Sequence, residues 1–149
     1  MPTTTLFILM ALVAGFSVPT QAGINAQLVH WTRSPVLAST ISFAVGTLTL
    51  IVYGLATRIP LPSLATAGNH PWWVWCGGAL GAFFVTATII LVPKLGATTM
   101  VTSILAGQMV ASLLLDHFGW LGYPVHPISM ARVLGVLLVG VGVWLIKAS

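Results

Sequence analysis

The sequence predicts an all-α membrane protein with five transmembrane helices, and two observations carry that prediction. Only five basic and one acidic side chains occur among the 149 residues, whereas 58% of the residues are hydrophobic. A soluble domain normally has charge on about a quarter of its residues. The six charged residues also lie almost entirely at the edges of long apolar runs, so lipid must surround most of the chain.

The charged residues indicate where the helices end, since a bilayer core about 30 Å thick is crossed by about 20 helical residues. The six are Arg33, Arg58, Lys94, Asp116, Arg132 and Lys147. The apolar runs between these residues predict the helices. A polar linker at 60–71 is not part of any predicted helix. We expect spans at about 5–29, 36–56, 72–92, 97–116 and 129–147. These spans use nearly the whole chain, so residues 1–149 are expected to form a single membrane domain.

The first helix carries the clearest polar pattern. Ser17, Gln21 and Asn25 recur every four residues and share one face, and Pro19 lies in the same stretch. Proline removes a backbone hydrogen bond and usually kinks a helix, so this face is a candidate cavity lining. Alternatively, Gln21 and Asn25 bond a neighbouring helix, a contact that contributes about 0.6 to 2 kcal/mol.

The start of the chain is also expected to be a retained helix rather than a signal peptide, because no basic segment precedes the apolar residues 6–18.

The second helix has a face of small, weakly polar residues that predicts a packing seam. Its members are Ser39, Ser42, Gly46 and Thr49.

The third helix begins with aromatic residues. Trp72, Trp73 and Trp75 predict a belt at the membrane interface, although Trp75 can instead point inward and stack on a substrate. Cys76 is the lone cysteine, which excludes a disulfide within the chain. Phe83 follows a glycine-rich stretch and is a candidate for contact with the apolar part of a substrate.

The fourth helix places Gln108, Ser112 and Asp116 on one face, with Gln108 near the middle of the span. An unsatisfied amide there costs several kcal/mol, so Gln108 must face protein, water or substrate.

The fifth helix is too short to cross the membrane unless Arg132 lies about a turn inside the span. Arg132 can extend to the interface or pair with Asp116 on the same side. A boundary ion pair and a proton-coupling carboxylate both remain open for Asp116.

The basic residues leave the orientation nearly balanced. Alternating sides put Arg33, Lys94 and Lys147 on one face of the membrane and Arg58 and Arg132 on the other. The positive-inside rule favours an external N-terminus and a cytoplasmic C-terminus, by three residues against two. So small a difference permits insertion in both orientations, and two opposite copies could form an antiparallel dimer.

Other functions lack the residues that they need. The histidines fall in loops or at helix ends, so haem ligation is not expected, and no cluster predicts another cofactor or a metal site. No nucleophile and base, paired carboxylates or phosphate-binding loop is present, so an enzyme is not expected. The five dispersed basic residues form no patch for nucleic acid.

Several motifs, in order, resemble those of a known family. They are Pro19-x-Gln21-x-x-x-Asn25, Ser42-Phe43-x-x-Gly46-Thr47, Gly77-Gly78-x-x-Gly81-Ala82-Phe83, Pro93-x-Leu95-Gly96-Ala97 and Gly107-Gln108-x-x-x-Ser112-x-x-x-Asp116-His117-x-Gly119. From about Gly15 to Gly142 the chain resembles the small five-helix branch of the drug/metabolite transporter superfamily. That branch was long catalogued as a bacterial inner-membrane domain of unknown function.

The resemblance implies a half-size transporter of the bacterial inner membrane, similar in size and assembly to the small multidrug resistance proteins. Its single-gene members are thought to be dual-topology homodimers and are described as exporters. This sequence departs from the multidrug group because its first helix has no membrane-embedded glutamate, and Gln21 and Asn25 occupy the polar face instead.

We therefore expect a secondary transporter that exports a small solute by alternating access. Gln21, Asn25 and Gln108 would bind the solute's polar part, with Phe83 and Trp75 as candidate aromatic contacts. Two other classes remain open: a non-transporting membrane subunit of a larger complex, and a narrow channel.

Overall fold

The computed structural model describes residues 2–148, and no β-strand occurs in that range. Five helices among these residues are long and apolar enough to cross a membrane, which confirms the predicted all-α class with five spanning helices. The chain divides into two compact units, Met1–Pro93 and Lys94–Ser149.

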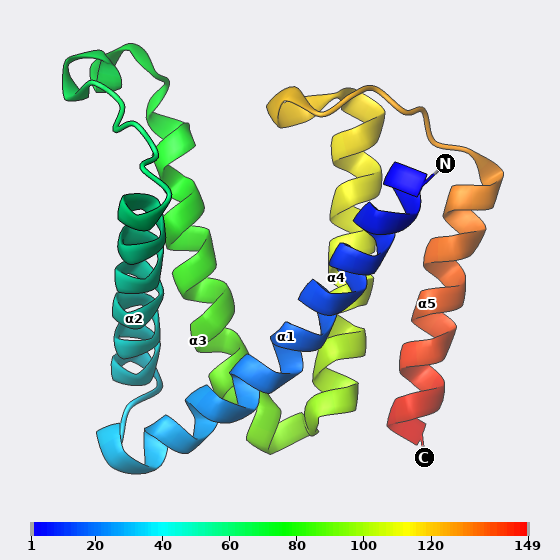
Figure 1. Ribbon diagram of the computed structural model, residues 1–149. Coiled ribbons are helices and arrows are strands. Elements are labelled where there is room, and N and C mark those ends of the chain that lie inside the picture. Colours follow the sequence, from blue (N-terminus) through cyan, green and yellow to red (C-terminus); the bar gives the residue numbers. More distant parts are fainter. Residues whose placement is uncertain (1, 149) are drawn as a thin grey trace. The chain divides into compact units, whose positions relative to one another are not determined.

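The first unit contains three long helices joined by one tight turn and one longer connection (Figure 1). They are α1 (Pro2–Thr32), α2 (Pro35–Ala56) and α3 (Gly77–Leu95). Two short 3₁₀ helices, Leu64–Asn69 and Trp72–Cys76, lie in the connection between α2 and α3. α2 and α3 run beside each other, whereas α1 leaves α2 at an angle from their common turn.

The turn between α1 and α2 is built from capping interactions. Arg33 takes a left-handed conformation with φ 56°, and its backbone N–H donates to the carbonyl of Val29 at 2.8 Å. Ser34 then caps α2, because its Oγ accepts a hydrogen bond from the N–H of Leu37 at 3.3 Å. Pro35 follows at the first turn, where a missing N–H costs nothing. The chain thus reverses within two residues.

The small core of the first unit lies near this turn. Ala38, Val85 and Ile89 are buried together, with Leu28, Val29 and Phe84 packed against them. Ser39 and Thr86 share a hydrogen bond of 2.8 Å between their hydroxyl oxygens, which joins α2 to α3. Ser39 therefore belongs to a packing seam. Further along, a Cβ at Gly81 would lie 3.4 Å from the ring of Phe43.

The third span begins at Trp72, as the sequence predicted, but it ends at Leu95 rather than at residue 92, and its first turn is not α-helical. Trp72–Cys76 is a 3₁₀ helix and the α-helix begins only at Gly77. Consecutive aromatic residues followed by two glycines have low helix propensity, which accounts for the delayed start. The helix also continues through Pro93 to Leu95, although Pro93 has no N–H to donate to the carbonyl of Ile89.

The second unit contains α4 (Ala97–Phe118), a short 3₁₀ helix (Trp120–Gly122) and α5 (Met130–Ala148), with α4 and α5 side by side (Figure 1). Gly119 ends α4 with φ 64°. A Cβ at this glycine would lie 2.7 Å from Cγ2 of Val125, so both its conformation and the close loop require glycine.

Candidate functional site

An open groove of about 610 Å³ lies between α1 and α2, in the angle that opens from their turn. Its volume falls in the range of about 300 to 1,000 Å³ typical of small-molecule sites. Most of its wall is apolar, with Val13, Phe16, Ile24 and Leu28 from α1 and Ile41 and Val45 from α2. Its polar side chains are Ser17, Thr20, Gln21, Asn25 and Ser42. The groove thus combines a large apolar surface with a short polar stripe.

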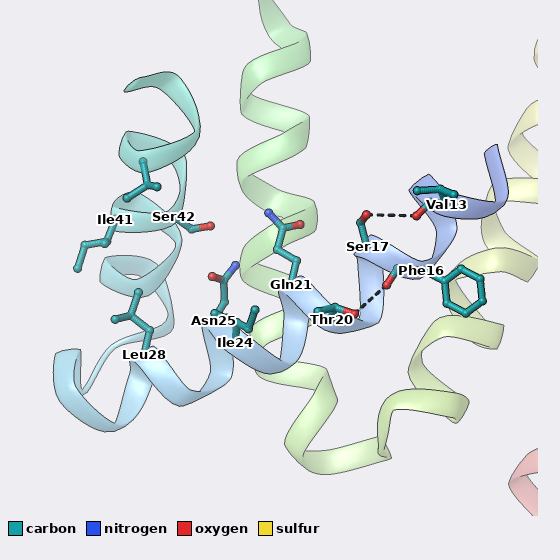
Figure 2. Close-up of a pocket in the computed structure, with 11 residues that line it drawn as sticks. Val13, Phe16, Ser17, Thr20, Gln21, Ile24, Asn25, Leu28, Ile41 and Ser42 are labelled. Carbon is teal, nitrogen blue, oxygen red and sulfur yellow. Dashed lines mark hydrogen bonds between the residues drawn. The ribbon is translucent and has the colours of Figure 1, made fainter. Parts of the chain in front are cut away.

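Asn25 is the most constrained polar residue of the groove. Its side chain is only 4% exposed, and its Nδ2 is buried without a hydrogen-bond partner in the part of the chain that the structure describes. Figure 2 shows the amide directed toward α2, near Ser42. Leaving a buried donor unsatisfied costs about 1 to 3 kcal/mol, so this amide is a strong candidate to bind a solute.

Gln21 lies one turn before Asn25 and points into the same groove (Figure 2). It is exposed and makes no side-chain hydrogen bond among residues 2–148. The groove's hydroxyls on α1 behave differently. Ser17 donates to the carbonyl of Val13 at 3.2 Å and Thr20 to that of Phe16 at 2.9 Å. The two amides are consequently the polar groups of α1 that remain available for a solute.

Pro19 lies inside α1, between the polar residues of the groove. It has no N–H to donate to the carbonyl of Gly15, four residues earlier. α1 nevertheless continues as one helix from Pro2 to Thr32.

The groove carries no ionisable side chain. All eleven of its lining residues are neutral, and the charged residues of the first unit, Arg33 and Arg58, lie beyond the ends of α1 and α2. No group of three or more metal-ligating side chains occurs in the described chain. The groove can therefore offer hydrogen bonds and apolar contact, but no charge of its own.

The other candidate residues of the first unit, Phe83 and Trp75, are not among the residues that line this groove. Phe83 is 75% exposed on α3 and lines a separate small depression with Thr86 and Ile90. Trp75 is exposed in the 3₁₀ helix before α3. Gln108 is exposed near the middle of α4 in the second unit, and its side chain makes no hydrogen bond within residues 2–148.

Ser42 and Gln27 are two residues whose positions the sequence patterns did not indicate. Ser42 was grouped with the packing seam, but it faces the groove while Ser39 faces α3. Ser39 and Ser42 lie three positions apart and thus about 60° apart around the helix axis. This angle could have indicated from the sequence that the two residues face different neighbours. Gln27 is a third amide on α1, exposed and outside the groove lining.

Asp116 and Arg132 form an ion pair at the loop end of α4 and α5. Arg132 Nη1 lies 3.2 Å from Asp116 Oδ2 and also donates to the carbonyl of His126 at 3.3 Å. The N–H of His126 donates to the carbonyl of Asp116 at 2.8 Å, and the N–H of Ile128 donates to Nδ1 of His117 at 3.2 Å. The pair is thus embedded in the contacts that hold the α4–α5 loop.

Comparison with known proteins confirms the resemblance seen in the motifs. The family described as "Putative inner membrane exporter, YdcZ" matches residues 6–145. The "Inner membrane protein YdcZ" of Escherichia coli (strain K12) is 36% identical over 75 residues, which cover 50% of this chain and 50% of that protein. The chain therefore spans about half the length of this curated relative. No solved structure matches.

From the ion pair we predict the effects of two substitutions on stability. Both Asp116→Asn and Arg132→Gln break the pair, but only Asp116→Asn removes the carboxylate. The two side chains are 30% and 39% exposed. We expect each variant to lose at most about 1 kcal/mol of unfolding free energy, as for partly exposed pairs.

We also expect both variants to keep wild-type solute flux and its pH dependence, measured across reconstituted vesicles. A proton-coupling role would appear as a loss confined to Asp116→Asn, with Arg132→Gln unaffected.

Proposed function

The chain belongs to the YdcZ family of multi-pass inner membrane proteins, whose description is that of exporters, and from this membership we propose that it exports a small solute by alternating access. The transporting form in this proposal is an antiparallel homodimer. The groove between α1 and α2 of each copy is the solute site, and no enzymatic step or cofactor takes part.

The buried amide of Asn25 carries this proposal. Within hydrocarbon a polar group needs a partner from protein, water or solute, and the Nδ2 of Asn25 has none among the described residues. Gln21 and Ser42 extend the polar stripe beside it. A solute that enters the groove can bond Gln21 and Ser42 directly and can bond the Asn25 amide once its side chain turns, while its apolar part contacts residues such as Phe16 and Ile24.

Two further features support an antiparallel pair in this proposal. Within the second unit, Gln108 lies near mid-span and is exposed without a side-chain partner, so protein outside this unit, water or a solute must contact it. The basic residues are divided three to two between the two sides, which permits opposite insertion of two copies. An antiparallel pair would have inverted symmetry like that of inverted-repeat transporters, whose sites lie near the midplane.

Alanine substitutions test the solute site. Gln21→Ala, Asn25→Ala and Gln108→Ala, made one at a time, should each reduce flux while the dimer persists. A neutral hydrogen bond contributes about 1 kcal/mol, so the expected reduction is about fivefold. Flux is measured as efflux of a panel of fluorescent amphipathic dyes from vesicles that contain the purified full chain.

Gln27→Ala is the matched control, because it removes an amide from the same helix outside the groove. It should transport like the wild type. Wild-type flux in all three groove and mid-span variants would refute the site.

Charge substitutions test the opposite orientations. Arg58→Gln leaves three basic residues against one, and Arg33→Gln combined with Lys94→Gln leaves one against two. Each variant should insert in a single, opposite orientation, because basic residues set topology. Expressed alone, each should lose flux, and co-expression should restore it.

A C-terminal reporter, read on both sides of the membrane, monitors insertion in the same cells. Full flux from either variant alone, with its orientation uniform, would contradict the antiparallel homodimer.

A further inference from the structure

We propose that the groove selects uncharged amphipathic solutes that carry a carbonyl, ether or hydroxyl oxygen, and excludes organic cations and anions of the same size. The inference deepens the proposed function and rests on it. It assigns the substrate class, a property that the family description leaves open.

The absence of charge from the groove lining argues against a cation. A cation that leaves water for an apolar groove needs a carboxylate or a comparable partner. None of the lining residues is ionisable, and the first unit contains no acidic residue. Asp116, the single acid of the sequence, is paired with Arg132 in the second unit.

An anion meets the same difficulty. The nearest ionisable residue of α1 is His30, five positions after Asn25 and outside the groove lining. The nearest arginine, Arg33, follows the end of α1 and lies eight positions after Asn25, which corresponds to about 12 Å along a helix axis. The carbonyl end of α1 lies between them and carries partial negative charge, which offsets the arginine. Asn25 and Gln21 can donate hydrogen bonds, but they cannot neutralise a full charge.

The amides do fit a neutral oxygen. The Nδ2 of Asn25 has no partner, and Gln21 provides a second free amide one turn away on the same face. A half-turn of either amide exchanges its donor and acceptor ends, so the site can donate to an oxygen and accept from a hydroxyl. The surrounding apolar wall and the groove volume of about 610 Å³ leave room for aromatic or aliphatic groups.

Three probes of similar size and different charge test the selectivity. Triphenylphosphine oxide is neutral and has one strong acceptor oxygen, whereas tetraphenylphosphonium is a cation and tetraphenylborate an anion. Each compound is radiolabelled, and its binding to the purified full chain in lipid nanodiscs is measured by scintillation proximity. The two unlabelled ions are also added as competitors of the neutral probe.

We expect wild-type protein to bind the neutral probe at least about tenfold more tightly than Asn25→Leu does, a difference of about 1.4 kcal/mol. Nanodiscs without protein measure unspecific partition into lipid. Neither ion should displace the neutral probe at equal aqueous concentration. In Asn25→Asp, binding of tetraphenylphosphonium should appear and rise with pH as the new carboxyl ionises.

Wild-type binding of either ion that equals or exceeds binding of the neutral probe would overturn the inference. This comparison uses the wild type alone, so it does not depend on the folding of a variant. Absence of specific binding by all three probes would also overturn it.

Flux of the same probes across vesicles is a separate measurement. Neutral-selective binding without flux would contradict transport and leave the solute class intact. Flux of the cation without neutral binding would contradict the solute class and leave transport intact.

Discussion

Polar groups inside a bilayer have no water to bond, and most features of this protein follow from that constraint. The five long helices satisfy their backbone groups internally, and hydroxyl side chains within them return to their own backbone. Ser17, Thr20 and Thr49 each donate to a carbonyl four residues earlier. An amide cannot be satisfied so readily within one helix. Asn25, Gln21 and Gln108 therefore remain as groups whose partners must come from outside their own helices.

The geometry of the first unit gives two of these amides a shared environment. The two-residue turn at Arg33 and Ser34 sends α2 away from α1 at an angle, and the groove occupies that angle. Packing near the turn buries Asn25, whereas Gln21, which lies one helical turn farther from Arg33 and Ser34, is exposed. A solute that enters the groove would thus meet Gln21 and Asn25 on the same wall. Neutral amides in an uncharged groove favour recognition by hydrogen bonding and apolar contact rather than by charge.

The sequence predicted the helices more readily than the site. Sparse charge and long apolar runs were sufficient for five spanning helices, because lipid imposes both length and composition on a span. The four-residue spacing of Ser17, Gln21 and Asn25 correctly placed them on one face, and all three line the groove. The residues of α2 that line the opposite wall of the groove were harder to predict, because small polar residues such as Ser42 occur both in packing seams and in binding sites.

Ser39 and Ser42 illustrate this limit. Both are small hydroxyl residues on one helix, but one bonds Thr86 on α3 and the other faces the groove. Which neighbour each meets depends on the angle between α1 and α2, which in turn depends on the backbone at Arg33. A left-handed conformation at a residue other than glycine is uncommon, and the sequence gives little indication of it.

The most direct test asks whether the amide face of α1 borders an aqueous groove. Single cysteines at positions 21, 23 and 25, in a chain with Cys76→Ser, are exposed in membrane vesicles to a membrane-impermeant thiol reagent. Gly23 is depth-matched, lies on the opposite side of α1 and has open space around its Cβ position. We predict ready labelling at 21, slower labelling at 25, where the native side chain is 4% exposed, and none at 23. Equal labelling at all three positions, or labelling at 23 alone, would contradict the assignment of this face as the solute site.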